Sequence, residues 1–353
     1  MCGFLRYLLV VFSGILLLMP QKVEASGPVN NPVTIEQKSF APPKDQRLLF
    51  IGQDVASIRA YVKSTGNVPA GWMTYTSIQQ LHGLNDAVEY GAGVQHAAAL
   101  LKTHPKTALQ VGLWMVGALE GVAQGEYDGN INRLADWLNQ LDCPVYLRIG
   151  YEFDLPDNHY EPALYVRAFR HLVDRLRSRG VANTAFVWHS YASTLSQPLT
   201  AWYPGDDYVD WCAVSLFDQD YEQLIPMAEF AKAHNKPLMI GEATPRGVGT
   251  VDFVLWWQWW EACDKYMKQY GVQALSYINT DWESHPMFKG QGWGDSRLEA
   301  NVKVASFWLE ETTREKYLHA SPELYASVNF KPGPARRSRV SSTLRSLLPY
   351  KWR

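Results

Sequence analysis

Short apolar runs alternate with amphipathic stretches of helical length between residues 47 and 315. A near-continuous run of aliphatic, β-branched and aromatic residues is typical of a strand buried on both faces of a parallel sheet. Eight such runs occur, at residues 47–54, 71–77, 108–117, 144–154, 184–192, 209–218, 237–244 and 274–282. The pattern therefore predicts eight parallel strands.

Helical patterns fill the intervals between these runs. The stretch 163–180 is one of them, and Gly180 is expected to end that helix. Another, 228–237, cannot continue past Pro237. Eight strands with intervening helices over roughly 270 residues predict a single-domain α/β fold, the (β/α)₈ TIM barrel. A doubly wound open sheet is the alternative, but no glycine-rich phosphate turn follows the first run.

The two ends of the chain depart from the barrel pattern. An apolar run at 7–19 follows Arg6, and the small residues Val23 and Ala25 come after it. This arrangement predicts a signal peptide at residues 1–25, and hence a secreted or periplasmic protein. The run is short for a bilayer span, and an uncleaved membrane anchor is the alternative. We expect a lead-in at 26–46, the catalytic barrel at 47–320 and a basic, disordered tail at 321–353.

Charge is distributed unevenly along the chain. Without residues 1–25 and the last 18 residues, the body holds 25 basic and 34 acidic side chains. An acidic body argues against nucleic acid as a partner. The last 18 residues hold six basic residues and no acidic one. Their simplest interpretation is a solvated tail, and membrane contact through anionic lipid is the weaker alternative. We expect a monomer.

Cysteine usage and spacing indicate no metal site and no disulfide framework. After residues 1–25, the chain keeps Cys143, Cys212 and Cys263, each in an apolar or helical segment. We expect three buried free thiols. Neither a CxxC nor an HExxH spacing is present, so the sequence predicts no metal and no cofactor.

Polar and aromatic residues gather where the predicted strands end. In a barrel of this kind the chemistry lies at the carboxyl ends of the strands. Capped strand ends or turns would explain any one of these residues equally well, but their joint occurrence indicates a site. They are Asp54, Trp114, Glu152, Asp154, His189, Tyr191, Asp218, Glu242, Asp281 and Trp282.

Two carboxylates stand out because each ends an apolar run. Glu152 lies at the end of the fourth run and Glu242 at the end of the seventh, on opposite sides of the predicted barrel mouth. Cleavage of a glycosidic bond needs one carboxyl group to protonate the leaving oxygen and another to support the oxocarbenium-like transition state. Arg148, inside the fourth run, needs a partner to offset its desolvation.

Four stretches make the chain resemble the clan A glycoside hydrolases, and within them family 26, best known for β-mannanases. They are "LLFIGQD", "YLRIGYEFD", "WYPGDDYVDWCAVSLFD" and "NKPLMIGEAT". The resemblance implies that Glu152 is the general acid/base, that Glu242 is the nucleophile, and that Arg148 keeps Glu242 ionised. It also implies retention of anomeric configuration, with the two carboxyl carbons about 5–5.5 Å apart.

Two features depart from the family pattern. Tyr151 stands where the family usually has histidine before the acid/base, and "DLPDNHYEP" replaces the aromatic-rich continuation common in mannanases. These departures leave the substrate open among β-mannan-like polysaccharides, β-xylan, β-glucan and exopolysaccharide.

Five further residues are candidates for substrate contact. The resemblance implies that Asp218 and Tyr221 touch substrate, with Tyr221 bonded to Glu242. Trp282 could form the floor of a sugar subsite or belong to the core. Trp114 could likewise stack on a sugar or belong to the core. His189 either lines the mouth or is structural.

Three functions are compatible with the residues. The first is a retaining, endo-acting glycoside hydrolase without cofactor. The second is an inactive carbohydrate-binding protein on the same scaffold, although a pure binder would not need the buried acid pair. The third, a metal-dependent barrel hydrolase, lacks the HxH pattern expected in the first strand.

Overall fold

The computed structural model describes residues 39–193 and 197–332. The predicted signal peptide, most of the lead-in and the last 21 residues, 333–353, lie outside these ranges.

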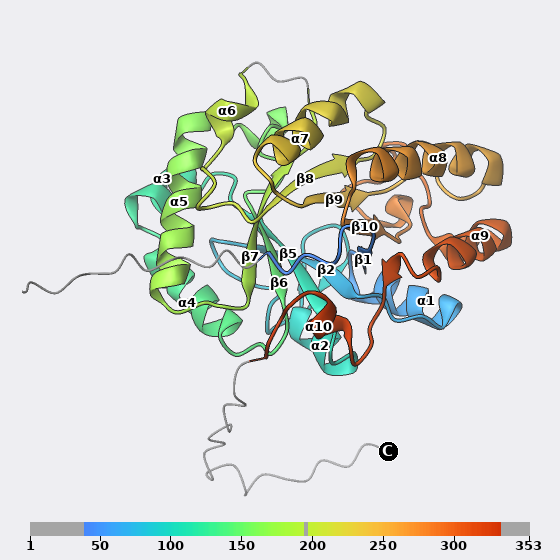
Figure 1. The fold of residues 1–353 in the computed structure, drawn as a ribbon, viewed down its shortest axis with the longest axis horizontal. Coiled ribbons are helices and arrows are strands. Elements are labelled where there is room, and N and C mark those ends of the chain that lie inside the picture. Colours follow the sequence, from blue (N-terminus) through green and yellow to red (C-terminus); the bar gives the residue numbers. More distant parts are fainter. Residues whose placement is uncertain (1–38, 194–196, 333–353) are drawn as a thin grey trace, which may run out of the picture. The chain divides into compact units, whose positions relative to one another are not determined.

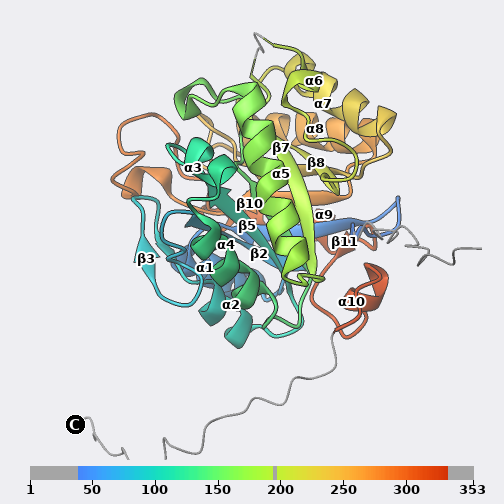
Figure 2. The ribbon, with the colours of Figure 1, turned by 90° about the vertical axis from the view of Figure 1, so that its left-hand side faces the viewer.

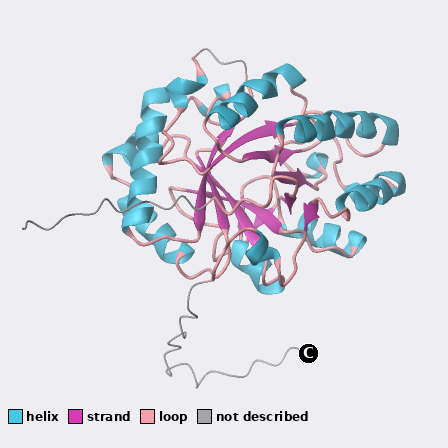
Figure 3. Cartoon of the chain, in the orientation of Figure 1, coloured by secondary structure: helices cyan, strands magenta, loops and turns pink. Residues whose placement is uncertain are grey.

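Eight parallel strands form a closed barrel, which confirms the predicted fold. The last strand pairs with the first, and this closure distinguishes the barrel from a doubly wound open sheet. Figure 3 shows the strands enclosed by helices. Around the barrel the strands are β1 (Arg47–Gly52), β2 (Gly71–Ser77), β5 (Ala108–Trp114), β6 (Val145–Ile149), β7 (Thr184–Ser190), β8 (Trp211–Leu216), β9 (Leu238–Ala243) and β10 (Ala274–Ile278).

Helices lie outside the sheet, and α3, α4 and α5 cover one side of it together (Figures 1 and 2). Gly180 follows α5 with φ +74°, as expected for a residue that ends a helix. The α-helices are α1 (Val55–Thr65), α2 (Ala97–Thr103), α3 (Leu119–Gln124), α4 (Asp128–Leu138), α5 (Pro162–Ser178), α6 (Leu199–Trp202), α7 (Tyr221–Ala233), α8 (Phe253–Tyr270), α9 (Val302–Thr312) and α10 (Leu324–Ser327).

Several short elements complete the fold. A small hairpin joins β3 (Val88–Glu89) to β4 (Val94–Gln95), and β11 (Tyr317–Leu318) pairs in parallel with the first two residues of β1. Within residues 39–193 and 197–332, 3₁₀ turns occur at Pro156–Asn158, Trp282–Ser284 and Leu298–Ala300.

The C-terminal boundary of the folded body lies beyond the predicted residue 320. Leu324, Val328 and Phe330 are buried, and the ring of Phe330 packs edge-on against Phe40 at 5.4 Å. Tyr146, at the start of β6, donates from its hydroxyl to the carbonyl of Phe40 over 2.6 Å. These apolar side chains cover the amino-terminal end of the barrel, so residues 321–332 belong to the fold and not to a tail.

The barrel interior contains a polar connection that supports β9. Gln110 on β5 donates from Nε2 to the carbonyl of Gly241 over 2.8 Å, and Ser276 on β10 donates to Gln110 Oε1 over 2.6 Å. All three lie in the interior, where a side-chain amide without partners would be costly. The bonds fix the backbone immediately before Glu242.

Cys143, Cys212 and Cys263 are buried free thiols, as the sequence predicted. None of the helices that the structure describes combines the length and apolar character of a membrane span.

Candidate active site

Glu152 lies in a tight turn directly after β6. Gly150 and Glu152 have φ values of +51° and +54°, a region that glycine adopts easily and glutamate rarely. The turn is held because the carbonyl of Glu152 accepts from Asn158 Nδ2 at 2.8 Å and from the amide of Leu155 at 2.9 Å. Strand β6 ends at Ile149, so the predicted run 144–154 extends beyond the strand into this turn. Strained backbone of this kind clusters at functional sites.

Glu242 lies on β9 and forms an ion pair with Arg148 of β6. Arg148 Nη1 is 2.5 Å from Glu242 Oε1, and the two side chains are 0% and 9% exposed. This is the contact that the family resemblance implied. Burial opposes the guanidinium charge, but Glu242 and Tyr75 outweigh it, so the pKa of Arg148 lies above its ordinary value.

Two tyrosine rings flank the arginine. The Arg148 guanidinium carbon lies 5.1 Å from the ring centre of Tyr75 and 5.0 Å from that of Tyr151, within cation–π range. Gly112 makes room for them, because a Cβ there would lie 2.7 Å from Tyr75 and 3.0 Å from Arg148 Nη2. Sequence reasoning missed Tyr75, which sits inside a strand run where a core residue is the default interpretation.

Ser215 and His189 connect the two carboxylates. Ser215 Oγ on β8 donates to Glu152 Oε1 over 2.5 Å and lies 3.1 Å from His189 Nε2. On the other side of its ring, His189 Nδ1 lies 3.1 Å from Arg148 Nη1. Both His189 and Ser215 are fully buried. His189 is thus inside the site, and Ser215 is a residue that the sequence did not indicate.

The protein environment shifts the pKa values of Glu152 and His189 in opposite directions. Burial raises the pKa of Glu152 to about 8, with the charge of Glu242 as the second cause. Burial and the neighbouring Arg148 hold the pKa of His189 well below its ordinary value. These shifts favour the protonated form of Glu152 and the uncharged form of His189.

Trp114 and Tyr151 form an aromatic wall beside these groups. Their ring centres are 5.9 Å apart, and Trp114 is 38% exposed at the end of β5. Tyr151 also lies nearly parallel to the His189 ring at 6.4 Å. An exposed indole on a polar site is a surface on which a sugar ring can stack.

Asp218 belongs to a second group of residues that the sequence only partly indicated. It pairs with Arg246, whose Nη1 lies 3.6 Å away, and Arg246 also approaches the hydroxyl of Tyr191 at 3.4 Å. The guanidinium of Arg246 lies 4.3 Å from the ring centre of Trp293. Neither Arg246 nor Trp293 ends a predicted strand, so the strand-end rule could not find them.

Trp282 is a core residue in this structure. It is 2% exposed, and its indole N–H donates to Thr244 Oγ1 at 3.0 Å and to Ser296 Oγ at 3.2 Å. Its ring packs on Trp293 at 4.8 Å and leaves no face free for a sugar. Of its two expected roles, the structure therefore favours the core.

Tyr221 does not lie where the resemblance implied. Its hydroxyl donates to Gln269 of α8 over 2.7 Å, and no hydrogen bond among the described residues joins it to Glu242. The physical reason is that Tyr221 begins α7, after Asp220 donates from its backbone to Gln223 Oε1. The first side chain of that helix turns toward α8 instead of the barrel mouth.

Two of the strand-end aspartates have structural roles. Asp54 caps α1 by accepting from the amides of Ala56 and Ser57. Asp154 accepts from Ser190 Oγ and from the amide of Tyr191, and so ties the Glu152 turn to the end of β7. For Asp54, the capped-strand-end interpretation is sufficient.

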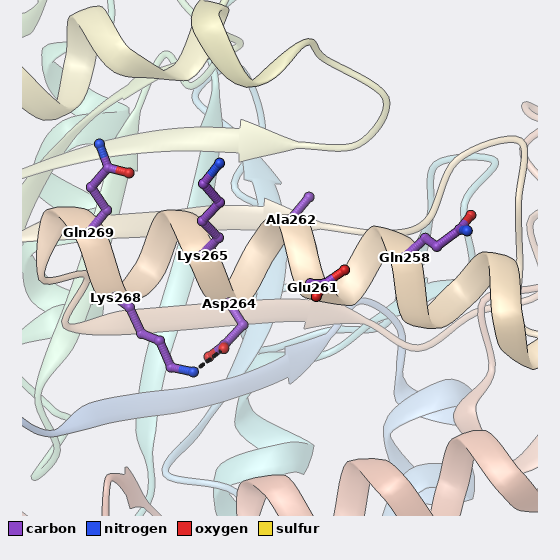
Figure 4. Close-up of a pocket in the computed structure, with 7 residues that line it drawn as sticks. All are labelled: Gln258, Glu261, Ala262, Asp264, Lys265, Lys268 and Gln269. Carbon is purple, nitrogen blue, oxygen red and sulfur yellow. Dashed lines mark ion pairs between the residues drawn. The ribbon is translucent and has the colours of Figure 1, made fainter.

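A hollow also lies outside the barrel, on the surface of α8 (Figure 4). Charged and amide side chains line it, including an ion pair between Lys268 and Asp264. Neither catalytic carboxylate candidate is part of it, so we do not assign chemistry to this surface. Within the described ranges, no cluster of His, Cys, Asp or Glu is arranged to hold a metal ion.

Comparisons with known proteins identify relatives of this chain. The sequence matches the model of Glycosyl hydrolase family 26 over residues 105–280. It is 34% identical to beta-1,3-xylanase TXYA of Vibrio sp. over 319 residues, covering 82% of this chain and 69% of the relative. A beta-1,3-xylanase of Alcaligenes sp. is 32% identical, with 82% and 68% covered.

Solved structures show the same fold. A family 26 beta-mannanase from Bacteroides ovatus superposes with a TM-score of 0.61 at 18% identity, covering 82% of this chain and 95% of the other. At that identity the likeness supports the barrel architecture and no finer statement.

Proposed function

The chain belongs to glycosyl hydrolase family 26 and is therefore an O-glycosyl hydrolase, and on that premise we propose that it cleaves a β-linked polysaccharide internally with retention of configuration. Glu152 is the general acid/base and Glu242 the nucleophile. The observation that carries this proposal is the unlike environment of the two carboxyl groups. Glu152 is buried with a raised pKa and bonds the Ser215 hydroxyl, whereas Glu242 is paired with a buried arginine.

The reaction proceeds by double displacement. Glu152 transfers its proton to the glycosidic oxygen while a Glu242 oxygen attacks the anomeric carbon, so the leaving sugar departs with a new hydroxyl group. A covalent ester between the sugar and Glu242 remains. Glu152, now a carboxylate, removes a proton from water, and the resulting attack on the anomeric carbon frees Glu242. Arg148 supports the carboxylate each time it is released.

We propose β-1,3-xylan as the first substrate to test. The two relatives that are 34% and 32% identical to this chain are both named beta-1,3-xylanases. The mannanase is 18% identical, and Tyr151 stands where the mannanase family usually has histidine. β-Mannan, β-1,4-xylan and β-glucan are the competing substrates.

A reducing-sugar assay over these four polysaccharides tests the proposal. We expect release from β-1,3-xylan, with a ladder of oligosaccharides and an early fall in viscosity, because internal cleavage shortens long chains first. Glu152→Ala and Glu242→Gln serve as inactive controls. Binding to a polysaccharide without release from any of the four would favour the non-catalytic carbohydrate-binding function instead.

Export is part of the same proposal, because a polysaccharide substrate lies outside the cell that makes the enzyme. The apolar run at 7–19 and the small residues before Ser26 support removal of residues 1–25. N-terminal sequencing of the protein from the culture medium or periplasm should begin at Ser26. An intact Met1 on membrane-bound protein would favour the anchor.

A further inference from the structure

His189 and Ser215 link Arg148 to Glu152 through three hydrogen bonds, and Arg148 sets the direction of donation along them. An arginine side chain has donors and no acceptor, so His189 Nδ1, 3.1 Å from Arg148 Nη1, must accept. A neutral imidazole then carries its hydrogen on Nε2, which lies 3.1 Å from Ser215 Oγ and also bonds the backbone of Val214. Because Nε2 carries the hydrogen, it cannot accept one from Ser215. The single hydroxyl hydrogen of Ser215 is thereby directed to Glu152 Oε1, 2.5 Å away.

We propose that Ser215 and His189 are positioning residues that determine which oxygen of Glu152 transfers the proton. The proposal rests on the acid/base role given to Glu152 above. Because Oε1 accepts from Ser215, the acidic hydrogen resides on Oε2, and this is the oxygen that serves the leaving group. After the transfer, the same Ser215 hydroxyl stabilises the carboxylate that must act as base in the second step.

Packing prevents the connection from rearranging. His189 and Ser215 are both buried, and the His189 ring lies against Gly241, where a Cβ would come within 2.9 Å of Nε2. Gly241 directly precedes Glu242, and Gln110 holds its carbonyl. The imidazole therefore lies between the strand of the nucleophile and the turn of the acid/base, closely packed against Gly241.

Other charged and titratable groups also act on Glu152, and a test must hold them constant. They come from the strand ends and from the turn itself. They are Glu242 of β9, Arg148 of β6, Tyr151 and Asp154 of the turn, and Tyr191 after β7. A substitution at Ser215 leaves all of them in place, so any difference from the wild type isolates the hydroxyl.

The test is Ser215→Ala, assayed on aryl glycosides of 1,3-linked xylobiose with good and poor leaving groups. For the phenyl glycoside we expect kcat/KM to fall roughly 10- to 100-fold, the range of one hydrogen bond to a charged group. For the 2,4-dinitrophenyl glycoside we expect a loss below about threefold in the glycosylation step, because that leaving group needs no proton. A role in folding alone would lower both equally.

The pH profile gives a second readout. The Ser215 hydroxyl favours the ionised form of Glu152, so its removal should raise the pKa of that carboxyl further. Since the protonated acid is the active form, the alkaline limb of kcat/KM should move to higher pH. An unmoved limb together with equal losses on both leaving groups would overturn the proposal.

Matched variants distinguish the loss of the His189–Ser215–Glu152 hydrogen bonds from a general loss of stability. Ser276→Ala removes another buried hydroxyl, one that binds Gln110 and touches neither carboxyl group, and should show no dependence on the leaving group. His189→Leu should behave like Ser215→Ala, whereas His189→Gln keeps an N–H donor and should recover part of the loss on the phenyl glycoside. Equal losses of activity on the phenyl glycoside for the two His189 variants would contradict the positioning role of His189.

Glu152→Ala distinguishes failure of this inference from failure of the proposed function. If Glu152→Ala shows the leaving-group dependence and Ser215→Ala does not, the positioning role alone is wrong. If Glu152→Ala itself loses activity equally on both glycosides, the acid/base assignment is wrong. The positioning role of Ser215 is then wrong as well, because it depends on that assignment.

Discussion

At the scale of single residues, two glutamates acquire different properties from their neighbours. Glu152 is buried, faces the charge of Glu242 and, within the described part of the chain, has a serine hydroxyl as the hydrogen-bond partner of its carboxyl group. Glu242 has a buried guanidinium within hydrogen-bond distance. In the proposed double displacement, the same side chain thus favours its protonated form in one place and pairs with an arginine in the other.

The acid/base role predicts how Glu152→Ala should respond to the leaving group and to azide. With a 2,4-dinitrophenyl glycoside the first step should stay near normal, because no proton is needed. The glycosyl-enzyme should then hydrolyse slowly, and azide should accelerate turnover by attacking in place of activated water. Stopped-flow release of dinitrophenol with and without azide measures both steps. Equal loss on good and poor leaving groups, with no azide effect, would contradict the role.

The raised pKa of Glu152 predicts a pH dependence of stability. Burial favours the neutral form of Glu152 in the folded state. The free energy of unfolding therefore falls as pH rises from 4.5, the pKa of the glutamate in the unfolded chain, to about 8, its pKa in the folded protein. Above pH 8 the loss of stability stays constant. Glu152→Gln removes this loss. Its melting temperature should therefore exceed that of the wild type by a few degrees at pH 8.5 and by less at pH 4.5. A gap that is equal at both pH values would contradict this account.

At the scale of elements, apolar periodicity was sufficient to predict every barrel strand and the position of both glutamates. It missed the hairpin at Val88–Gln95, which is too short and too glycine-rich to show alternation. It also missed Ser215 and Tyr75, because polar residues inside buried strands carry no periodic signal. These two are revealed only when neighbouring strands bring Glu152 and Arg148 beside them.

Close strand packing around Arg148 predicts that Gly112→Ala impairs catalysis. The added Cβ would overlap Tyr75 and press on Arg148 Nη2, displacing the partner of Glu242. We expect kcat to fall about 10-fold or more, since small displacements of catalytic groups are costly. The fold should persist, as circular dichroism can check.

Gly129→Ala is the matched control for that variant. Gly129 lies in α4, and a Cβ there would have open space around it. The substitution should leave kcat unchanged and raise the free energy of unfolding by up to about 1 kcal/mol, through helix propensity. Equal kcat values for the two alanine variants would contradict the role of Gly112.

At the scale of the whole molecule, the sequence indicated one barrel but placed its end too early. Basic composition dominates residues 321–353 as a block and obscures the apolar residues Leu324, Val328 and Phe330 near its start. Their role depends on Phe40, which is 290 positions away from Phe330 in the chain and in contact with it in space. No local pattern reports a contact of that separation.

Two truncations test this boundary. Ending the chain after residue 320 removes three buried side chains and exposes Phe40, so the melting temperature should fall by several degrees, because each buried apolar side chain contributes about 1.5–3 kcal/mol. Ending it after residue 332 keeps them and should leave the melting temperature within about 1 °C of the full chain. Indistinguishable truncations would show that residues 321–332 do not support the barrel.

Covalent trapping of the nucleophile tests the central claim most directly. A 2-deoxy-2-fluoro glycoside of 1,3-linked xylobiose with a dinitrophenyl leaving group should react quickly and hydrolyse slowly, because fluorine destabilises both transition states while the leaving group speeds the first. Peptide mapping by mass spectrometry should find the added sugar on Glu242, in the fragment containing "MIGEAT". Label on another carboxylate, or an inverted product with no trapped enzyme, would contradict the double-displacement account.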